Sequence, residues 1–111
     1  MTEENKNLLE KIPPQSLEAE QSLLGSLLID KDSIIKVVDQ IMPEDFYRDA
    51  HKFIFESIRE LYNNQEPIDV ITLANRLEEK KQLTKIGGRA FLAQLSNTVA
   101  TSANISNYAN I

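Results

Sequence analysis

Asp49-Ala-His-Lys-Phe-Ile-Phe-Glu-Ser-Ile-Arg-Glu-Leu-Tyr62 is a stretch without glycine or proline in which apolar residues predominate. On a helical wheel they cover more than half of the circumference, whereas a surface helix shows an apolar stripe only somewhat wider than about 100°. We therefore predict a central helix that neighbouring elements cover on two or three sides. Asp49 is its expected N-cap, because a carboxylate there can accept a hydrogen bond from a first-turn amide. Its solvated side is marked by Lys52, Glu56, Arg59 and Glu60.

A first helix is expected to begin at Ser16, a favourable N-cap, with Glu18 and Glu20 near its positive end. Its buried face is predicted to consist of leucines, namely Leu17, Leu23, Leu24, Leu27 and Leu28. Glu20 lies in the middle of this face, where a carboxylate is unfavourable unless it is hydrogen-bonded. We therefore expect Glu20 to be buried and to accept hydrogen bonds from backbone amides or a hydroxyl of another helix. Gly25 in the same helix indicates close approach of another helix.

The segments on either side of the central helix also show helical periodicity. Asp32 or Ser33 is expected to cap a short helix, which Pro43 ends while opening the next turn. The apolar residues of this helix are Ile34, Ile35, Val37, Val38 and Ile41. Asp69 is the expected cap of a later helix. The buried face of that later helix is predicted to contain Val70, Leu73, Ala74 and Leu77.

The C-terminal part of the chain is organised by the pair Gly87-Gly88, which is expected to break the backbone between Leu83, Ile86 and the next helix. That helix is predicted from about residue 89 to 96, ending at Asn97-Thr98. A last helix is expected to start at Thr101 or Ser102, with Ile105, Tyr108 and Ala109 on one side. Because it shows no C-terminal signal, we expect it to be truncated and the chain to be a fragment. No segment alternates like a strand, so the predicted class is all-α, a compact orthogonal multi-helix bundle around the central helix.

The composition indicates one domain, since 111 residues can bury a sufficient core without cross-links. There is no cysteine, which excludes disulfides and thiolate metal sites. No apolar run approaches the roughly 20 residues that span a bilayer, and the polar N-terminus is unlike a signal peptide. We expect a soluble cytoplasmic protein with a polar, poorly ordered tail over residues 1–15 and a helical domain over residues 16–111. The net charge of −5 disfavours a general nucleic-acid-binding surface.

No set of residues predicts a catalytic, cofactor-binding or metal site. His51 is the only histidine, and we interpret it as a partly buried side chain bonded to a neighbour rather than as a general base or metal ligand. Acidic residues near the start of the central helix are interpreted as capping and dipole residues. These are Glu44, Asp45 and Asp49. A phosphate-binding loop of the GxxxxGK[ST] type is absent, so neither ATP nor magnesium is expected to bind this chain.

A group of basic residues lies close together in sequence, namely Arg76, Lys80, Lys81, Lys85 and Arg89. Such a group can form a patch for an acidic partner or a nucleic acid. Glu78 and Glu79 interrupt it, which favours a solvated face. The uncharged stretch over residues 90–111 is expected to be partly core and partly a surface for another chain.

Several motifs occur in the order and with the spacing of one known family. They are Pro13-Pro-Gln-Ser-Leu-Glu-Ala-Glu-Gln-Ser-Leu-Leu-Gly25, Glu44-Asp-Phe-Tyr-Arg48, His51 with Ile54-Phe55, Pro67-Ile-Asp-Val-Ile-Thr-Leu-Ala74, Ile86-Gly-Gly-Arg-Ala-Phe-Leu-Ala-Gln-Leu95 and Ala103-Asn-Ile-Ser-Asn-Tyr-Ala109. Together they resemble the N-terminal domain of the bacterial replicative DNA helicase, the DnaB family. The resemblance covers nearly the whole chain beyond the tail.

This resemblance implies a ring of six subunits that unwinds duplex DNA with ATP and magnesium. The N-terminal domains form a collar, usually a trimer of dimers, that recruits primase and a helicase loader. ATP, magnesium and most of the DNA are bound by a C-terminal domain absent from this chain. The chain is therefore expected to be a non-catalytic assembly and partner-binding domain, and to be mainly monomeric or weakly dimeric when isolated.

Two other classes of function remain open from the residues. Residues 69–95 can be taken as a helix-turn-helix of a DNA-binding regulator, with Arg89 beginning the recognition helix. That helix offers only Arg89 and Gln94 for bases and phosphates, whereas its other side is apolar. A small helical enzyme is the third class, and the absence of a plausible set of reactive residues weighs against it.

Overall fold

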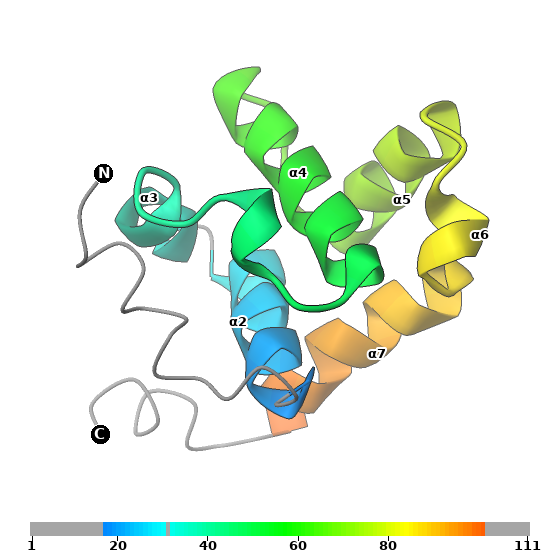
Figure 1. The fold of residues 1–111 in the computed structure, drawn as a ribbon, viewed down its shortest axis with the longest axis horizontal. Helices are drawn as coiled ribbons and strands as arrows, with labels where there is room; N and C mark the ends of the chain where they lie inside the picture. Colours follow the sequence, from blue (N-terminus) through cyan, green and yellow to red (C-terminus); the bar gives the residue numbers. More distant parts are fainter. Residues whose placement is uncertain (1–16, 31, 102–111) are drawn as a thin grey trace.

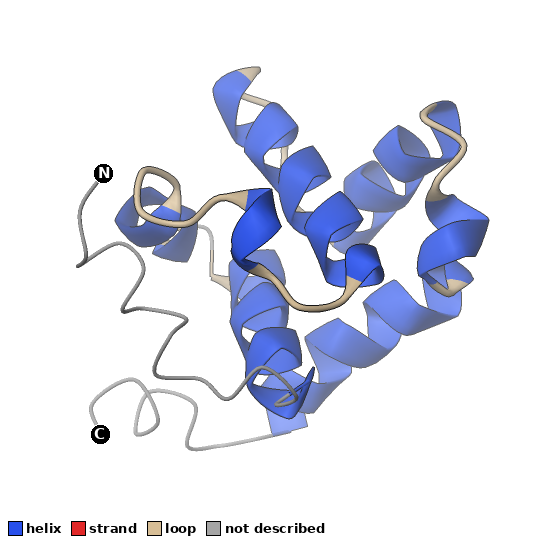
Figure 2. Cartoon of the chain, in the orientation of Figure 1, coloured by secondary structure: helices blue, strands red, loops and turns tan. Residues whose placement is uncertain are grey.

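The computed structural model describes residues 17–30 and 32–101, which form helices and turns without any strand. The elements are α2 (Leu17–Ile29), α3 (Ser33–Val37), the 3₁₀-helix η1 (Pro43–Asp45), α4 (Asp49–Asn63), α5 (Val70–Glu79), α6 (Leu83–Ile86) and α7 (Gly88–Thr101). The predicted all-α class is thus confirmed for these residues, and the helices cross one another rather than running parallel (Figure 2). The predicted tail, the N-cap Ser16 and the last helix from Ser102 onward lie outside them, whereas Thr101, the other predicted cap of that helix, is the last residue of α7.

Helix α4 is the central element, as predicted, and it contacts α2, η1, α5 and α6 (Figure 1). Its apolar side chains Ile54, Phe55, Ile58 and Leu61 are fully buried. The wide apolar surface of this helix explains why neighbouring elements cover it on several sides. Within the described part of the chain, no helix is both long enough and apolar enough to cross a membrane.

The prediction that Asp49 caps α4 is wrong. The N-cap position is occupied by Arg48, whose backbone is extended (φ −88°, ψ 138°), and no side chain caps the helix. Asp49 is already the first helical residue, so its carboxylate lies one position too far along the chain to accept a bond from a first-turn amide. It lies 3.5 Å from the ammonium group of Lys52 instead.

Helices α2 and α7, from opposite ends of the described part of the chain, pack against each other (Figure 1). Gly25 of α2 is buried, as are Leu92 and Leu95 of α7. The prediction that Asn97-Thr98 ends this helix is wrong, because α7 continues to Thr101. The Thr98 hydroxyl donates to the Gln94 carbonyl oxygen at 2.8 Å, a bond within the helix that lets threonine remain helical.

The predicted cap at Asp69 and the predicted break at Gly87-Gly88 are confirmed. The Asp69 carboxylate accepts a hydrogen bond from the backbone N–H of Thr72 at 2.7 Å and so caps α5. Gly87 adopts a left-handed conformation, with φ +111°, at the end of the short helix α6. A β-carbon at Gly87 would lie 3.0 Å from that of Phe91. The corner between α6 and α7 therefore requires glycine for both conformation and space.

The segment before α4 follows the prediction less closely. Pro43 opens η1, as expected, and Ile34, Val38 and Ile41 are buried. The prediction that Pro43 ends the preceding helix is wrong, because α3 already ends at Val37, and the apolar Ile35 is 59% exposed. The reason is the shortness of α3, which presents only one side to the core.

Candidate functional site

Glu20 and His51 form a buried pair that joins α2 to α4. Nδ1 of His51 lies 2.6 Å from Oε1 of Glu20, and the backbone N–H of Tyr47 donates to Oε2 at 2.7 Å. Only 3% of Glu20 and none of His51 is exposed. The predicted burial and hydrogen bonding of Glu20 are confirmed. Its second donor is an imidazole, where the sequence led us to expect another amide or a hydroxyl.

Aromatic rings surround His51. Its ring is stacked on that of Phe91, with centroids 6.2 Å apart, and the ring of Phe46 meets it edge-on at 6.4 Å. Nε2 is buried and has no hydrogen-bond partner among the described residues. A general base must reach the proton that it removes, whereas this ring is sealed inside the protein. The geometry therefore favours a structural role for His51, which is completely rather than partly buried.

The acidic residues near the start of α4 do not converge on one point. Oδ2 of Asp45 accepts a hydrogen bond from the Met42 backbone N–H at 2.8 Å, across η1. Asp49 pairs with Lys52, and Glu44 is exposed. Over residues 17–30 and 32–98, no three histidine or acidic side chains are placed to hold a metal ion. Of these three residues, Asp45 caps η1, whereas Asp49 does not cap α4.

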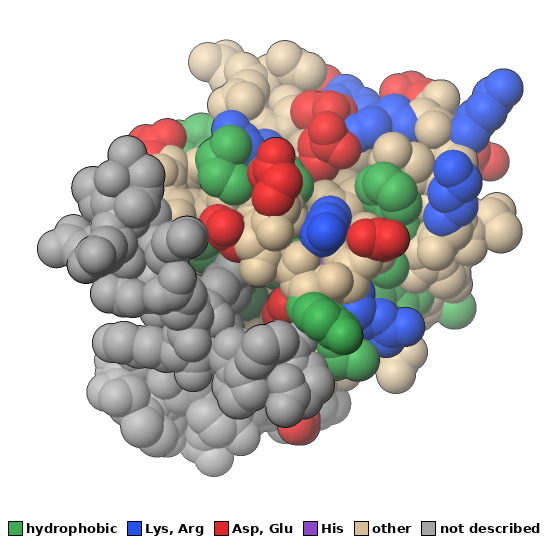
Figure 3. Space-filling view, in the orientation of Figure 1, with side chains coloured by type: hydrophobic (Ala, Val, Ile, Leu, Met, Phe, Trp, Pro, Cys, Tyr) green, Lys and Arg blue, Asp and Glu red, His purple; other side chains and the backbone are tan. Residues whose placement is uncertain are grey.

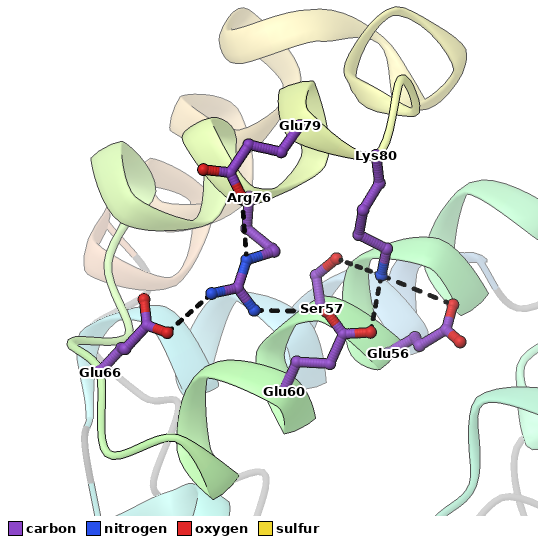
Figure 4. Close-up of polar contacts among 7 residues, drawn as sticks. All are labelled: Glu56, Ser57, Glu60, Glu66, Arg76, Glu79 and Lys80. Carbon is purple, nitrogen blue, oxygen red and sulfur yellow. Dashed lines mark hydrogen bonds and ion pairs between the residues drawn. The ribbon is translucent and has the colours of Figure 1, made fainter.

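Arg76 lies at the centre of a network of ion pairs between α4 and α5 (Figure 4). Its Nη2 lies 2.7 Å from Oε2 of Glu66, and its Nη1 lies 3.3 Å from Oε1 of Glu60. Nε lies 3.4 Å from the exposed carboxylate of Glu79. The hydrogen bond to Glu66 is the main cause that raises the pKa of Arg76 above its usual value. The guanidinium is therefore a permanent cation in this network.

Lys80 extends the same network toward the middle of α4 (Figure 4). Its Nζ lies 3.0 Å from Oε2 of Glu60 and 3.8 Å from Oε1 of Glu56. It also donates to the hydroxyl of Ser57 at 3.1 Å, and Ser57 is fully buried. Lys80 thus satisfies a hydroxyl that the fold has removed from water.

The basic residues that lie close together in sequence differ in their exposure in the structure. The side chains of Arg76 and Lys80 are only 17% and 23% exposed, so the predicted solvated face is wrong for these two. They are partly buried because their partners come from α4, which no local pattern in α5 reveals. Arg89 donates to Asn75 and Glu78, at 3.0 and 3.1 Å. The side chains of Lys81 and Lys85 are exposed, as predicted.

A shallow groove of about 300 Å³ lies between η1 and α4. Its lining includes Met42, Pro43, Glu44, Glu56, Arg59 and Glu60. The Arg59 Nη1 donor lies 3.6 Å from Sδ of Met42, a weak acceptor. Figure 3 shows one face of the molecule, on which acidic, basic and apolar side chains are interspersed. Sequence analysis missed this groove, because its two walls belong to separate elements, η1 and α4.

Comparison with known proteins identifies the family. The family described as "DnaB-like helicase N terminal domain" matches residues 12–111. The chain belongs to this family. The replicative DNA helicase DnaB of Geobacillus stearothermophilus is 41% identical over 102 residues, which are 92% of this chain and 22% of that protein. The corresponding helicase of Mycobacterium leprae is 44% identical over 99 residues, which are 89% of this chain and 16% of that protein.

A solved DnaB N-terminal domain has a closely similar fold. The crystal structure of the N-terminal domain of DnaB helicase from Mycobacterium tuberculosis aligns with a TM-score of 0.77 and 45% sequence identity. The alignment covers 87% of this chain and 67% of that one. By contrast, the chain spans about a fifth of the length of the full helicases that it matches.

Four of the six motifs that carry the DnaB resemblance contribute residues to the packing around Glu20 and His51. Glu20 comes from the first motif, Tyr47 from the second and His51 from the third, and the ring stacked on His51 is Phe91 of a later one. Residues from four motifs of this DnaB domain therefore form one packed cluster. The helix-turn-helix alternative gains no support, since Arg89 is bonded to α5 and the apolar side of α7 is buried.

Proposed function

We propose that this chain is the non-catalytic assembly and partner-binding part of a replicative DNA helicase subunit. In this proposal, a domain over residues 16–111 contributes dimeric contacts to the collar of a hexameric ring, and residues 1–15 are a polar tail. The domain also presents a surface to primase and to the helicase loader during DNA replication in the cytoplasm. The parent enzyme unwinds DNA with a further domain, which binds ATP, magnesium and most of the DNA.

The observation that carries this proposal is the match of residues 12–111 to the helicase N-terminal family. Its similar relatives are named replicative DNA helicases, and the aligned region is only 22% and 16% of their length. A chain of this kind is therefore one domain of a larger subunit. Its contribution to that subunit follows from what its own side chains are free to do.

The internal contacts of the domain favour a role in surface recognition. The buried carboxylate of Glu20 and the ring of His51 bond each other, and Arg76 and Lys80 are held by carboxylates of α4. Groups that are already paired in this way serve the fold. What the domain offers to other molecules is an exposed surface, rich in acidic side chains.

We infer that the isolated chain neither binds nor hydrolyses ATP. Its glycines are Gly25, inside α2, and Gly87-Gly88, at the corner between α6 and α7. The pair is followed by Arg89-Ala90 rather than by the Lys-Ser/Thr of a phosphate-binding loop. Titration of ATP with magnesium in a calorimeter should give no binding heat, and a stoichiometric heat with micromolar affinity contradicts this inference.

Deletion of residues 1–111 from the full-length subunit tests the proposed role. We expect the truncated ring to dissociate at higher protein concentration in sedimentation than the intact ring, and to lose stimulation of primase. ATP hydrolysis on single-stranded DNA serves as the control that the remaining domain is folded. A truncated ring that assembles with unchanged stability and stimulates primase normally contradicts the proposal.

A further inference from the structure

The groove between η1 and α4 carries more negative charge than its own cations neutralise. Its charged lining consists of the carboxylates of Glu44, Glu56 and Glu60 and the guanidinium of Arg59. Glu60 is already paired with Lys80 and Arg76, at 3.0 and 3.3 Å. The remaining carboxylates therefore decide what the groove attracts.

The negative charges of Glu44 and Glu56 are largely unpaired among the described residues. Glu44 is exposed on η1 and makes no ion pair with the described residues. Glu56 has a single ion-pair contact, at 3.8 Å from Lys80, and half of its side chain is exposed (51%). Carboxylates that are this accessible and this weakly paired can bind an incoming cation without a large loss of hydration.

Met42 adds an apolar surface next to these carboxylates. It is 48% exposed, although its backbone N–H is fixed by Asp45. A methionine side chain is flexible and polarisable, and such side chains are common where a surface adapts to different partners. Pro43 continues the apolar strip along the same wall of the groove. The groove thus combines an apolar strip with two weakly paired negative charges.

We propose that this groove binds a segment of a protein partner that carries lysine or arginine side chains beside an apolar anchor residue. The cations lie against Glu44 and Glu56, and the anchor packs on Met42. The volume of about 300 Å³ is at the lower end of the range for ligand pockets, which suits one or two anchoring side chains rather than a cofactor. This inference deepens and rests on the proposed role as a partner-binding domain.

An anionic ligand fits the groove less well. Among the described residues of the lining, Arg59 is the only cation, and its guanidinium contacts the sulfur of Met42 rather than a carboxylate. A phosphate or an acidic peptide would meet three carboxylates there. Arg59 instead opposes the binding of a cationic segment. Its replacement therefore provides a test with an effect of opposite sign.

The test uses the methyl groups of methionine, because the chain has only Met1 and Met42. With ¹³C-methyl labelling, Met42 reports on the groove and Met1 serves as an internal reference. The probes are a short amphipathic helical peptide of leucine and lysine and a matched peptide of leucine and glutamate. We expect the lysine peptide to shift the Met42 signal saturably, with little effect on Met1, and the glutamate peptide to leave both signals unchanged.

Matched variants separate binding in the groove from general attraction to an acidic protein. Glu44→Gln with Glu56→Gln should weaken the binding of the lysine peptide at least about threefold. Glu18→Gln with Asp39→Asn removes the same charge from exposed positions outside the groove, and the Kd should stay unchanged. Arg59→Gln should strengthen binding. An unshifted Met42 signal, equal weakening by both double variants, or equal binding of the glutamate peptide would overturn the proposal.

The full-length helicase distinguishes this inference from the proposed function. The Glu44→Gln, Glu56→Gln subunit should still form rings but should show reduced stimulation of primase. If deletion of residues 1–111 abolishes stimulation and the double variant does not, the groove inference fails and the proposed function stands. If the deletion has no effect, the proposed function fails, whatever the peptides show.

Discussion

Helix α4 makes two polar clusters that contain the same kinds of groups but differ in their access to water. At its first turn, His51 bonds Glu20 of α2, with side-chain exposures of 0% and 4%. Farther along, Glu56 and Glu60 bond Arg76 and Lys80 of α5, with exposures between 17% and 51% (Figure 4). Comparing the two clusters shows whether the stability that a cluster contributes follows the number of its ion pairs or their burial.

The difference follows from what replaces a lost partner. In the buried cluster, removal of one group leaves the others without hydrogen bonds and without water, which is strongly destabilising. In the network of Arg76 and Lys80, which is only partly buried, water and salt ions replace a lost partner, so a single pair contributes only about 0–1 kcal/mol. The smaller cluster should therefore have the larger effect on folding.

The largest effect is expected for Glu20→Ala. It leaves the N–H of Tyr47 and Nδ1 of His51 without an acceptor, and should lower the free energy of unfolding by about 3 kcal/mol. Denaturant unfolding followed by circular dichroism measures this loss. Glu20→Gln is the matched control, since it keeps one oxygen acceptor and should be less destabilising. An unchanged midpoint for Glu20→Ala would mean that the buried pair contributes nothing.

A double-mutant cycle on the buried pair gives the next largest effect. Glu20→Leu and His51→Phe each leave the other polar group unpaired, whereas the double variant removes both and keeps apolar packing around Phe91. The free energy of unfolding lost in the double variant should be smaller than the sum of the two single losses, by about 1–3 kcal/mol. Strict additivity of the three measured free energies would show that the two side chains do not interact.

Arg76→Met tests the exposed network at its best-connected residue. It keeps an apolar stem but removes three ion pairs, and the loss should be about 1 kcal/mol. Because salt screens exposed charges, the loss should shrink in about 1 M salt, where the Debye length is about 3 Å. The loss caused by Glu20→Ala should persist there. A salt-independent loss for Arg76→Met would place this guanidinium energetically with the buried cluster.

The smallest effect is expected for Lys80→Met, at about 0.5 kcal/mol. The variant removes the pairs with the partly exposed Glu60 and Glu56 and leaves one neutral acceptor, the hydroxyl oxygen of Ser57, without its donor. Lys85→Met, at an exposed position without an ion pair to the described residues, is the control and should not change the melting temperature. A loss for Lys80→Met as large as that for Glu20→Ala would remove the distinction between the two clusters.

Local signals in the sequence were sufficient for the helical elements. The apolar surface around α4, the cap at Asp69 and the break at Gly87-Gly88 depend on neighbours within a few positions, and each was predicted. The start of α4 was predicted one residue too late. Asp49 is a favourable cap and Arg48 is not. In the structure the backbone is extended at Arg48 and helical from Asp49, next to the bond from Tyr47 to Glu20 and the packing of η1.

The sequence by itself determined the all-α class, the family, and the burial of Glu20, because periodicity, motif order and the penalty for a carboxylate on an apolar face are all visible in one dimension. Only the tertiary structure decided that His51 is the partner of Glu20, that Arg76 and Lys80 are held by α4, and that Met42 and Glu56 share a groove. The physical reason is distance along the chain. These pairs lie 14 to 31 positions apart, and their contact depends on how whole helices pack, which no local pattern of residues encodes.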